Sequence, residues 1–542
     1  MKRQFGLLRR LGRMVVCAAL LTVQGGAQAQ RSADQWYAQG QTQLKAGQFA
    51  QAATSFGAAA GLNPSAANYR WLAEAAVGAG DYARASRAFA QVIKGYRARS
   101  YNITANALES RAAPYRQEVS FFMQGAAPGR LLPRCARRLA KFEPLSGLYL
   151  GLYVNEQGIA ADGTLSAGSQ LGRRLAVYFR YFRLRDPRGL PPAEIFPIRF
   201  VQAVKAAGGA AHIALEPGVP LSEISEASLT PFARAAREAG IPIFLRFAGE
   251  FNDPGNAWSR DPALYRAKFR LVHDVMARLA PNVAMVWMPM PSRLEIIDAY
   301  FPGDDAVDWV GISLYSVPFR NGDVSAGTLN QNPLDVLGPF YDKYACAHPF
   351  QISEFASSHR SEARPGVDYA PFAAEKLRTL FWGAYLKYPR LKNINWFDLS
   401  MQDSPFVQYK ATERRNDYSL FTSAAKLGAF RELLAQPYFL TAPVVSEQQE
   451  AGVPVLRPVP FPASFRPSGN VRGAVYLKTF ETPTALALSL DGSAVPILST
   501  PPYTFVLSAT ALTLGQHTLR LLAKGAKGQI LIDQVKVFTA QP

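Results

Sequence analysis

The central part of the chain alternates between short apolar runs and longer stretches whose apolar residues recur at helical spacing. The runs are bounded by turn residues and are short, so they predict strands. Eight of them follow one another: Leu148–Val154, Leu175–Phe182, His212–Leu215, Ile241–Phe247, Val283–Met288, Val307–Leu314, Phe350–Ile352 and Ile394–Phe397. The helical stretches are Ile198–Ala207, Leu221–Ala239, Leu264–Leu279, Leu334–Ala347, Tyr369–Tyr388 and Leu427–Leu434. This alternation over residues 145–438 predicts a (β/α)8 barrel, and no glycine-rich phosphate turn favours a doubly wound sheet.

Residues 32–125 show a helical pattern that repeats at an offset of 33 residues. The matching positions are Gly47 with Gly80, Phe49 with Tyr82, Ala52 with Ala85, and Phe56 with Phe89. Small residues at helix crossings followed by an aromatic resemble tetratricopeptide repeats, and such hairpins need neighbours, so we expect a third helical pair over Asn102–Met123. The repeats could dock a protein partner or a polymer, or could only cap the next domain.

The pattern changes again after the predicted barrel. Residues 439–470 are rich in Pro, Val and Ser, which predicts a semi-rigid linker. Residues 471–540 consist of short alternating segments separated by turns such as Asp491-Gly492, which predicts a small all-β sandwich of immunoglobulin-like size. A spacer role is favoured over carbohydrate binding, because no row of aromatics follows one face. The predicted fold class is therefore multidomain: helical repeats, barrel and sandwich.

The N-terminal segment has the features of a signal peptide. A basic stretch precedes the apolar run Met14–Val23, and Ala27-Gln28-Ala29 supplies a cleavage signal, so residues 1–29 are expected to be removed during export to the periplasm or beyond the cell. No later stretch is apolar and long enough to span a membrane. Cys135 and Cys346 remain in the mature chain. We expect them not to pair, because one lies between domains and the other in a barrel helix.

The chain carries a formal net charge of +19, and five cations belong to the signal segment. A basic exported protein can favour an anionic polysaccharide or the cell surface. A solvated basic surface without such a partner explains the charge equally well. Nucleic acid is disfavoured, since Lys and Arg are scattered and no nucleic-acid motif accompanies them.

Two carboxylates stand at the ends of predicted strands. Glu250 follows the fourth strand and Glu354 the seventh. Active sites of these barrels form at the carboxyl ends of the strands, and glycoside hydrolysis uses a pair of carboxyl groups. One glutamate at a strand end is as often a structural ion-pair partner, but the paired placement predicts a glycosidase.

Five pieces of the barrel region, in their order and spacing, resemble glycoside hydrolase family 26. They are LRFAGEFND (245–253), PNVAMVWMP (281–289), YFPGDDAVDWVGISLY (300–315), QISEFASS (351–358) and NINWFDLS (393–400). The resemblance implies a retaining mechanism with Glu250 as general acid/base and Glu354 as nucleophile.

The resemblance also implies roles for neighbouring residues. Tyr315 would hold the ionised Glu354, Trp396 and Trp258 would stack on sugars, and Arg246 would set the charge states of the two carboxylates. Glu216 occupies an acidic strand-end position of less defined role. Tyr315 and Trp396 could instead be packing residues of the barrel top, and Arg246 a core ion pair. Trp258 could equally well be structural.

The chain departs from the family beside the predicted acid. Gly249 stands where the family has a histidine, and Phe251, Asn252 and Asp253 replace the pattern usual in mannanases. Mannan is therefore not assumed, and Asn252 remains a candidate substrate-binding residue.

The leading prediction is an exported retaining endo-β-glycanase acting on β-mannan, xylan, glucan or an exopolysaccharide, without metal or cofactor. The five histidines show no metal-ligand spacing. One alternative is a catalytically impaired polysaccharide-binding or scaffold protein of an exopolysaccharide assembly. A lyase, or another barrel hydrolase using the same carboxylates, ranks lower.

Overall fold

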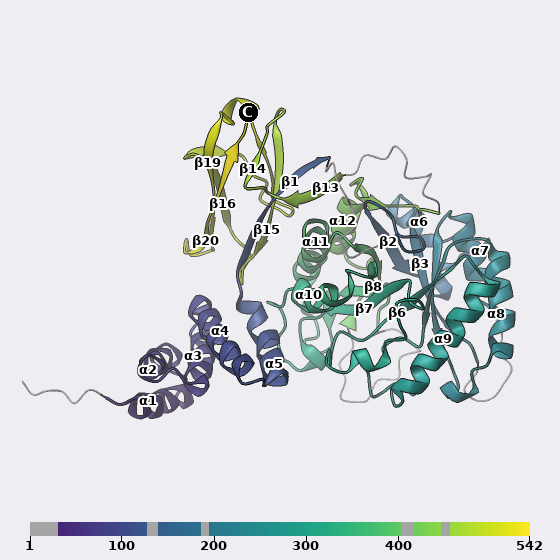
Figure 1. Ribbon diagram of the computed structural model, residues 1–542, viewed down its shortest axis with the longest axis horizontal. Coiled ribbons are helices and arrows are strands. Elements are labelled where there is room, and N and C mark those ends of the chain that lie inside the picture. Colours follow the sequence, from purple (N-terminus) through teal and green to yellow (C-terminus); the bar gives the residue numbers. More distant parts are fainter. Residues whose placement is uncertain (1–30, 127–138, 186–193, 403–415, 446–455) are drawn as a thin grey trace, which may run out of the picture. The chain divides into compact units, whose positions relative to one another are not determined.

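The structure is a computed structural model that describes residues 31–126, 139–185, 194–402, 416–445 and 456–542 (Figure 1). It consists of two compact units, residues 1–95 and 96–542. The predicted signal peptide lies outside the described residues. Within the described ranges, no helix is both long and apolar enough to cross a membrane.

The first unit is helical, and its repeat in sequence is a repeat in structure. Gly47 and Gly80, with φ of 72° and 73°, turn the chain into α2 and α4 in a conformation that glycine adopts without strain. Phe56 of α2 and Phe89 of α4 are fully buried at matching positions. The helices are α1 (Ala33–Lys45), α2 (Phe49–Leu62), α3 (Ala66–Gly78) and α4 (Tyr82–Ala98).

The second unit contains a closed barrel of eight parallel strands, which confirms the predicted (β/α)8 fold. Closure comes from pairing of the last strand with the first, where Ile394 lies opposite Leu150. The strands are β2 (Leu148–Tyr153), β3 (Val177–Arg183), β4 (Ala210–Glu216), β5 (Ile243–Phe247), β6 (Val283–Trp287), β7 (Trp309–Ser316), β8 (Phe350–Ser357) and β10 (Leu391–Trp396).

The barrel helices begin at side-chain caps that the sequence supplies. Asp261 caps α9, Asn332 caps α10 and Ser423 caps α12, each accepting a backbone N–H of the first turn. Ser225 does the same for α8, so this helix begins at Glu226 and not at Leu221 as the apolar pattern predicts. The helices are α6 (Ser166–Leu171), α7 (Ile198–Ala206), α8 (Glu226–Ala239), α9 (Pro262–Leu279), α10 (Pro333–Tyr344), α11 (Ala370–Lys387) and α12 (Ala424–Leu434).

Strand β8 is longer than its apolar run predicts. It continues to Ser357, so Glu354 lies within the strand and not in the turn after it. The pairing with β7 shifts register between Ile312 and Ser313, and beyond the shift Ser313 lies opposite Glu354. The irregularity thus sets which residue of β7 stands beside this carboxylate.

The predicted third helical pair is wrong in its second half. Asn102–Ala112 forms helix α5, but Pro114 follows in a short 3-10 turn, and Glu118–Ala126 is strand β1. Proline disfavours continuation of the helix, and the residues after it alternate between two faces. Phe121 enters the core of a β-sandwich, whereas Phe122 joins the apolar cluster of the barrel.

The predicted linker is also wrong, because part of it belongs to that sandwich. Strand β13 (Leu456–Pro460) pairs with β1, which precedes the barrel in sequence. The four-stranded sheet has the order β13-β1-β15-β18 and packs through Phe121 and Phe505 against the five-stranded sheet β14-β20-β19-β16-β17. The other strands are β14 (Ser464–Phe465), β15 (Val471–Lys478), β16 (Ala485–Leu490), β17 (Ser493–Val495), β18 (Thr504–Leu507), β19 (Gly515–Lys524) and β20 (Ile530–Ala540).

The segment before the barrel is fastened to the barrel by a buried ion pair. Glu143 accepts from Arg390 through both carboxylate oxygens, at 2.9 and 3.1 Å. Arg390 also donates to the backbone oxygen of Cys346 at 2.6 Å. Arg390 therefore links Glu143 to the backbone at Cys346. The expectation that Cys346 stays unpaired is wrong: it is disulfide-bonded, and Cys17 and Cys135 lie outside the described residues.

Candidate active site

Glu354 is surrounded by three hydrogen-bond donors from three other strands. Tyr181 of β3 donates to Oε1 and Tyr315 of β7 to Oε2, both at 2.5 Å. Arg246 of β5 also donates to Oε1, and both side chains of this ion pair are 5% exposed. Donors and a cation aimed at one carboxylate stabilise its charged form. The arrangement gives Glu354 three hydrogen-bond donors and one positive charge.

The two tyrosines remain donors over the whole working range of pH. Burial, and next the negative charge of Glu354, raise the pKa of Tyr181 and of Tyr315 well above the ordinary value. Burial is the largest influence on Arg246 and opposes its charge, but the charges and hydrogen bonds of Glu354 and Tyr181 together outweigh burial and raise the pKa of the guanidinium. Arg246 also lies 5.1 Å from the ring centre of Tyr181, a cation–π contact that fixes its position.

Glu250 stands in a strained turn directly after β5. Its φ is 54° and that of Ala248 is 46°, values that non-glycine residues adopt rarely and that are common at functional sites. The turn is held from both sides, since the Glu250 N–H donates to the oxygen of Met288 at 2.7 Å and Asn256 donates to the oxygen of Glu250 at 2.9 Å. The backbone therefore presents this carboxyl group in one orientation.

The carboxyl group of Glu250 is electrostatically coupled to Glu354. Burial and the charge of Glu354 raise the pKa of Glu250 to about 7, against the lowering effects of Ser313 and Arg246. Ser313 donates to Oε1 of Glu250, and its backbone lies opposite that of Glu354 in the β7–β8 pairing. One carboxyl group can therefore hold a proton near neutral pH beside another stabilised as the anion.

Gly249 leaves the space that Arg246 occupies. A Cβ atom at position 249 would lie 3.2 Å from Cδ and 3.3 Å from Nε of Arg246, closer than side chains ordinarily approach. Any larger residue would press on the guanidinium that pairs with Glu354. The glycine that marks the departure from family 26 is thus matched to the position of Arg246.

Trp258 and Asn252 both support the turn of Glu250. The indole Nε1 of the partly buried Trp258 donates to the oxygen of Gly249 at 2.8 Å. Asn252 is 1% exposed; its amide nitrogen donates to the oxygens of Met290 and Ser292, and its amide oxygen accepts from the Met290 N–H. Trp258 remains a candidate for sugar stacking, whereas Asn252 ties two loops together and has no surface for a substrate.

Trp396 does not form a sugar platform as predicted. Its ring is fully buried, Nε1 donates to the oxygen of Tyr418 at 3.0 Å, and Phe355 packs against it at 5.5 Å. The next residue, Phe397, points to the other side and lies 5.8 Å from the ring of Tyr315. The strand alternates faces, so the residue after the predicted one reaches the site.

Glu216 lies apart from the carboxylate pair. It is at the end of β4 and pairs with Arg183 at 3.2 Å, and both side chains are partly exposed. The structure does not bring it into the hydrogen-bond network of Glu354.

Tyr181 and Ser313 are site residues that the sequence reasoning missed. Tyr181 has the same strand parity as Phe179, whose ring contacts His212 inside the barrel, so inward parity could have found it. Nothing in the local sequence marks Ser313, because its position opposite Glu354 depends on the register shift between β7 and β8.

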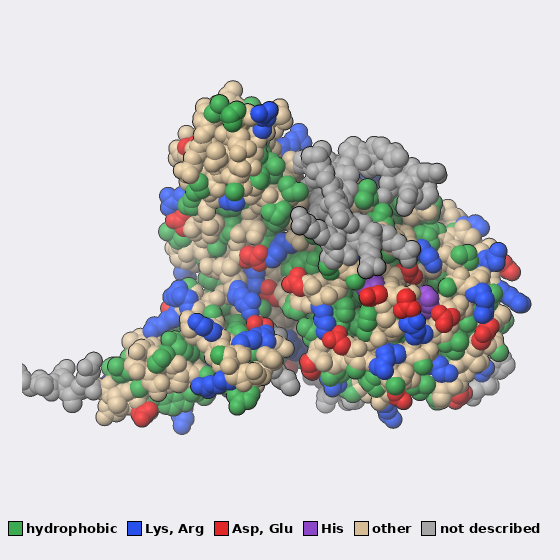
Figure 2. Space-filling view, viewed as in Figure 1, with side chains coloured by type: hydrophobic (Ala, Val, Ile, Leu, Met, Phe, Trp, Pro, Cys, Tyr) green, Lys and Arg blue, Asp and Glu red, His purple; other side chains and the backbone are tan. Residues whose placement is uncertain are grey.

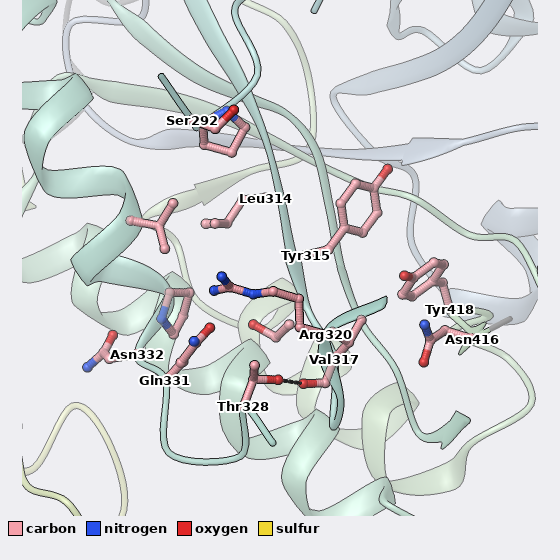
Figure 3. A pocket seen from close by; sticks show the side chains of 14 residues that line it. Ser292, Leu314, Tyr315, Val317, Arg320, Thr328, Gln331, Asn332, Asn416 and Tyr418 are labelled. Carbon is pink, nitrogen blue, oxygen red and sulfur yellow. Dashed lines mark hydrogen bonds between the residues drawn. The ribbon is translucent and has the colours of Figure 1, made fainter. Parts of the chain in front are cut away.

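A pocket of about 470 Å³ adjoins this site (Figure 3). It lies at the end of β7 and reaches the start of α10, and Tyr315 forms part of its wall. Its lining residues are Pro291, Ser292, Leu314, Tyr315, Ser316, Val317, Arg320, Thr328, Gln331, Asn332, Pro333, Val336, Asn416 and Tyr418.

Charge elsewhere on the molecule is dispersed. In the space-filling view, Lys and Arg side chains are scattered over the visible face and form no single patch (Figure 2). In the part of the chain that is described, no group of three or more His, Cys, Asp or Glu side chains is placed to hold a metal ion.

Comparison with known sequences finds short matches. No protein-family model matches the chain. A β-1,3-xylanase from a Vibrio species is 31% identical over 102 residues, which are 18% of this chain and 22% of that protein. A β-1,3-xylanase from an Alcaligenes species is 28% identical over 102 residues, with 18% and 21% covered. The chain thus spans about a fifth of the length of the curated relatives it matches.

Comparison with solved structures returns several glycosidases. A modular family 26 endo-β-1,4-mannanase from Cellulomonas fimi aligns at 16% identity and a TM-score of 0.39, covering 74% of this chain and 96% of that one. A family 26 β-mannanase from Bacteroides ovatus aligns at 14% identity and 0.38, covering 54% and 90%. A β-glucuronidase from Bacteroides uniformis aligns at 11% identity and 0.38, covering 72% and 45%. These values assign the chain to no family, and the barrel is established by its own strand order.

Proposed function

We propose that this protein is a retaining glycoside hydrolase acting on a β-linked polysaccharide, with Glu354 as nucleophile and Glu250 as general acid/base. The observation that carries the proposal is the opposite treatment of the two carboxyl groups. Glu354 accepts from Tyr181, Tyr315 and Arg246, whereas the pKa of Glu250 is raised to about 7. A carboxyl group whose pKa is raised towards neutral, beside a second carboxylate held by hydrogen-bond donors, is typical of the acid/base and nucleophile of a glycosidase.

The first chemical step forms a glycosyl-enzyme. A carboxylate oxygen of Glu354 attacks the anomeric carbon, the bond from that carbon to the leaving oxygen breaks, and Glu250 gives its proton to that oxygen. Esterification removes the negative charge of Glu354, which is a main cause of the raised pKa of Glu250. The pKa of Glu250 then falls, so it stays ionised and ready to accept a proton.

The second step returns the enzyme to its starting state. Glu250 takes a proton from water, the water oxygen attacks the anomeric carbon, and the bond to Glu354 breaks. Because Glu250 must be protonated for the first step and its pKa is about 7, kcat/KM is expected to fall tenfold per pH unit well above that value. The two steps together retain the anomeric configuration.

The substrate is proposed to be the backbone of a β-linked polymer, cleaved internally outside the cytoplasm. The partial relatives are named β-1,3-xylanases and the similar structures include β-1,4-mannanases, so both linkages belong in the first panel. The helical unit is proposed to hold the enzyme on a partner or on the polymer itself.

The test uses the mature chain with Glu250→Gln and Glu354→Gln as matched variants of equal size. The substrates are β-1,3-xylan, β-1,4-xylan, β-1,4-mannan and mixed-linkage β-glucan, and ¹H NMR of early products reports the anomeric configuration. Cleavage by the wild type alone, with retained configuration, is the expected result. Products that both variants form equally well, or inverted products, contradict the proposed mechanism. Binding without cleavage by all three proteins would instead support the scaffold function.

A further inference from the structure

The pocket beside Tyr315 is large enough for a ligand and shares this tyrosine with the carboxylate site. Its volume of about 470 Å³ lies within the usual range of small-molecule sites. Tyr315 lines the pocket and donates to Oε2 of Glu354 at 2.5 Å. A sugar unit in this pocket would therefore contact a residue that is hydrogen-bonded to Glu354.

Arg320 is the only charged side chain among the residues that line this pocket. It is exposed, and within the described ranges it has no ion-pair partner. The guanidinium extends into the space near Leu314 and Gln331 (Figure 3). By contrast, Arg183, at the end of β3, is paired with Glu216. An unpaired guanidinium inside a pocket is a preformed site for an anion, and its planar fork fits a carboxylate with two hydrogen bonds.

Asn416 supplies a second, independent sign of a ligand. Its side chain is 9% exposed and lines the pocket, and its amide oxygen is buried without a hydrogen-bond partner. A buried polar atom left unpaired costs free energy unless a ligand or water satisfies it. An amide acceptor in the same pocket as a free guanidinium matches a ligand that has hydroxyl groups and one negative charge.

We propose that this pocket is a subsite for an anionic sugar unit, in which Arg320 binds the carboxylate of a uronic acid and Asn416 accepts a sugar hydroxyl. The inference rests on the proposed glycosidase function and narrows its substrate class to acidic polysaccharides. The net charge stays positive when the five cations of the predicted signal segment are left out of the total of +19, and it favours approach of such a polymer. Arg320 is a specificity residue here, and the reaction itself does not require it.

The experiment compares oligosaccharides that differ only at C6. β-1,4-linked mannohexaose carries hydroxymethyl groups where β-1,4-linked hexamannuronate carries carboxylates; cellohexaose and β-1,4-linked hexaglucuronate form a second pair. Each is titrated by calorimetry into Glu250→Gln, Glu250→Gln/Arg320→Gln and Glu250→Gln/Arg234→Gln. Arg234 lies exposed on α8, away from the pocket, so Arg234→Gln is a control that removes one positive charge elsewhere on the surface. Cleavage by the wild type, Arg320→Gln and Arg320→Lys is measured in parallel.

We expect the acidic member of at least one pair to bind about 10- to 100-fold more tightly than its neutral member, and Arg320→Gln to abolish that preference, as for a hydrogen-bonded charge pair. Arg234→Gln should leave the preference intact, and Arg320→Lys should keep part of it. Equal affinity for both members of both pairs, or equal loss with Arg234→Gln, overturns the inference. A sulfated mannohexaose that binds as tightly as the hexamannuronate overturns the carboxylate assignment.

Failure of this inference is separable from failure of the proposed function. Calorimetry reads the pocket without any turnover, whereas the reaction is read on neutral and acidic substrates alike. A wild type that cleaves mannohexaose but shows no preference for acids removes the subsite and keeps the enzyme. Tight binding of hexamannuronate that depends on Arg320, with no cleavage of any substrate, keeps the subsite and removes the enzyme.

Discussion

Two buried arginine–glutamate pairs in the barrel unit have almost the same burial and opposite surroundings. Arg390 and Glu143 are 2% and 0% exposed, and Arg246 and Glu354 are each 5% exposed. Glu143 uses both oxygens on its arginine and accepts from the Ala140 N–H, so its surroundings satisfy it within the protein. Glu354 stands beside a second carboxyl group and one residue away from a pocket. Burial of an ion pair is therefore no sign of catalysis by itself; the neighbours decide.

The largest expected effect is on turnover and comes from Glu354→Gln. Glu354→Gln should lower kcat by on the order of 10⁴-fold or more, because the nucleophile is lost. The same change should lower the pKa of Glu250, since the charge of Glu354 raises it. Turnover assays and ¹³C NMR titration of the Glu250 carboxyl group measure the two effects. A Glu250 pKa that stays near 7 in this variant would contradict the coupling.

Glu143→Gln should lower the stability of the protein and leave kcat nearly unchanged, in contrast to Glu354→Gln, which should lower kcat. The change leaves Arg390 buried without its counter-ion, which costs about 3 kcal/mol or more. Urea denaturation followed by tryptophan fluorescence should show that loss of unfolding free energy, and kcat of the folded protein should stay within about twofold of the wild type. A kcat that falls along with stability would remove the contrast between the two pairs.

Gly249→Ala probes how closely the turn is fitted to the Arg246–Glu354 pair. The new Cβ would press on Cδ and Nε of Arg246. We expect kcat/KM to fall roughly fivefold to tenfold, equivalent to about 1 kcal/mol of transition-state stabilisation. Gly168→Ala is the matched control, because a Cβ there meets no atom within 4 Å. Equal effects of the two changes would refute the fit between Gly249 and Arg246.

The smallest expected effect is a displaced pH profile. Ser313 donates to Glu250 and lowers its pKa, so Ser313→Ala should raise that pKa and move the alkaline limb of kcat/KM to higher pH. Ser357→Ala is the control, since its hydroxyl donates to the oxygen of Ala373 and contacts neither carboxylate. The limb is located from kcat/KM measured between pH 5 and 9 with a neutral substrate. A limb that moves to lower pH would mean that Ser313 does not stabilise the anion.

Much of the barrel could be predicted from the chain alone, because each strand and helix has its own hydrophobic period. The strands that carry Glu250 and Glu354 followed from the same reasoning, since a polar residue after an apolar run marks the rim of a barrel, although β8 continues past Glu354 to Ser357. The prediction of Trp396 as a sugar platform was wrong. A shift of one residue along a strand moves a side chain to the other face of the sheet, and the local sequence does not determine which residues face the site.

The sequence by itself determined the alternation of elements, the repeating pattern of the N-terminal helices and which two strands carry the two glutamates, all of which depend on local spacing. Only the tertiary structure decided which side chains surround those glutamates. The register of β8 against β7 placed Ser313 opposite Glu354, and closure of the barrel brought Tyr181 and Arg246 to Glu354. It also paired β1, which precedes the barrel in the sequence, with β13, which follows it. Such partners are far apart in sequence, and only packing selects them.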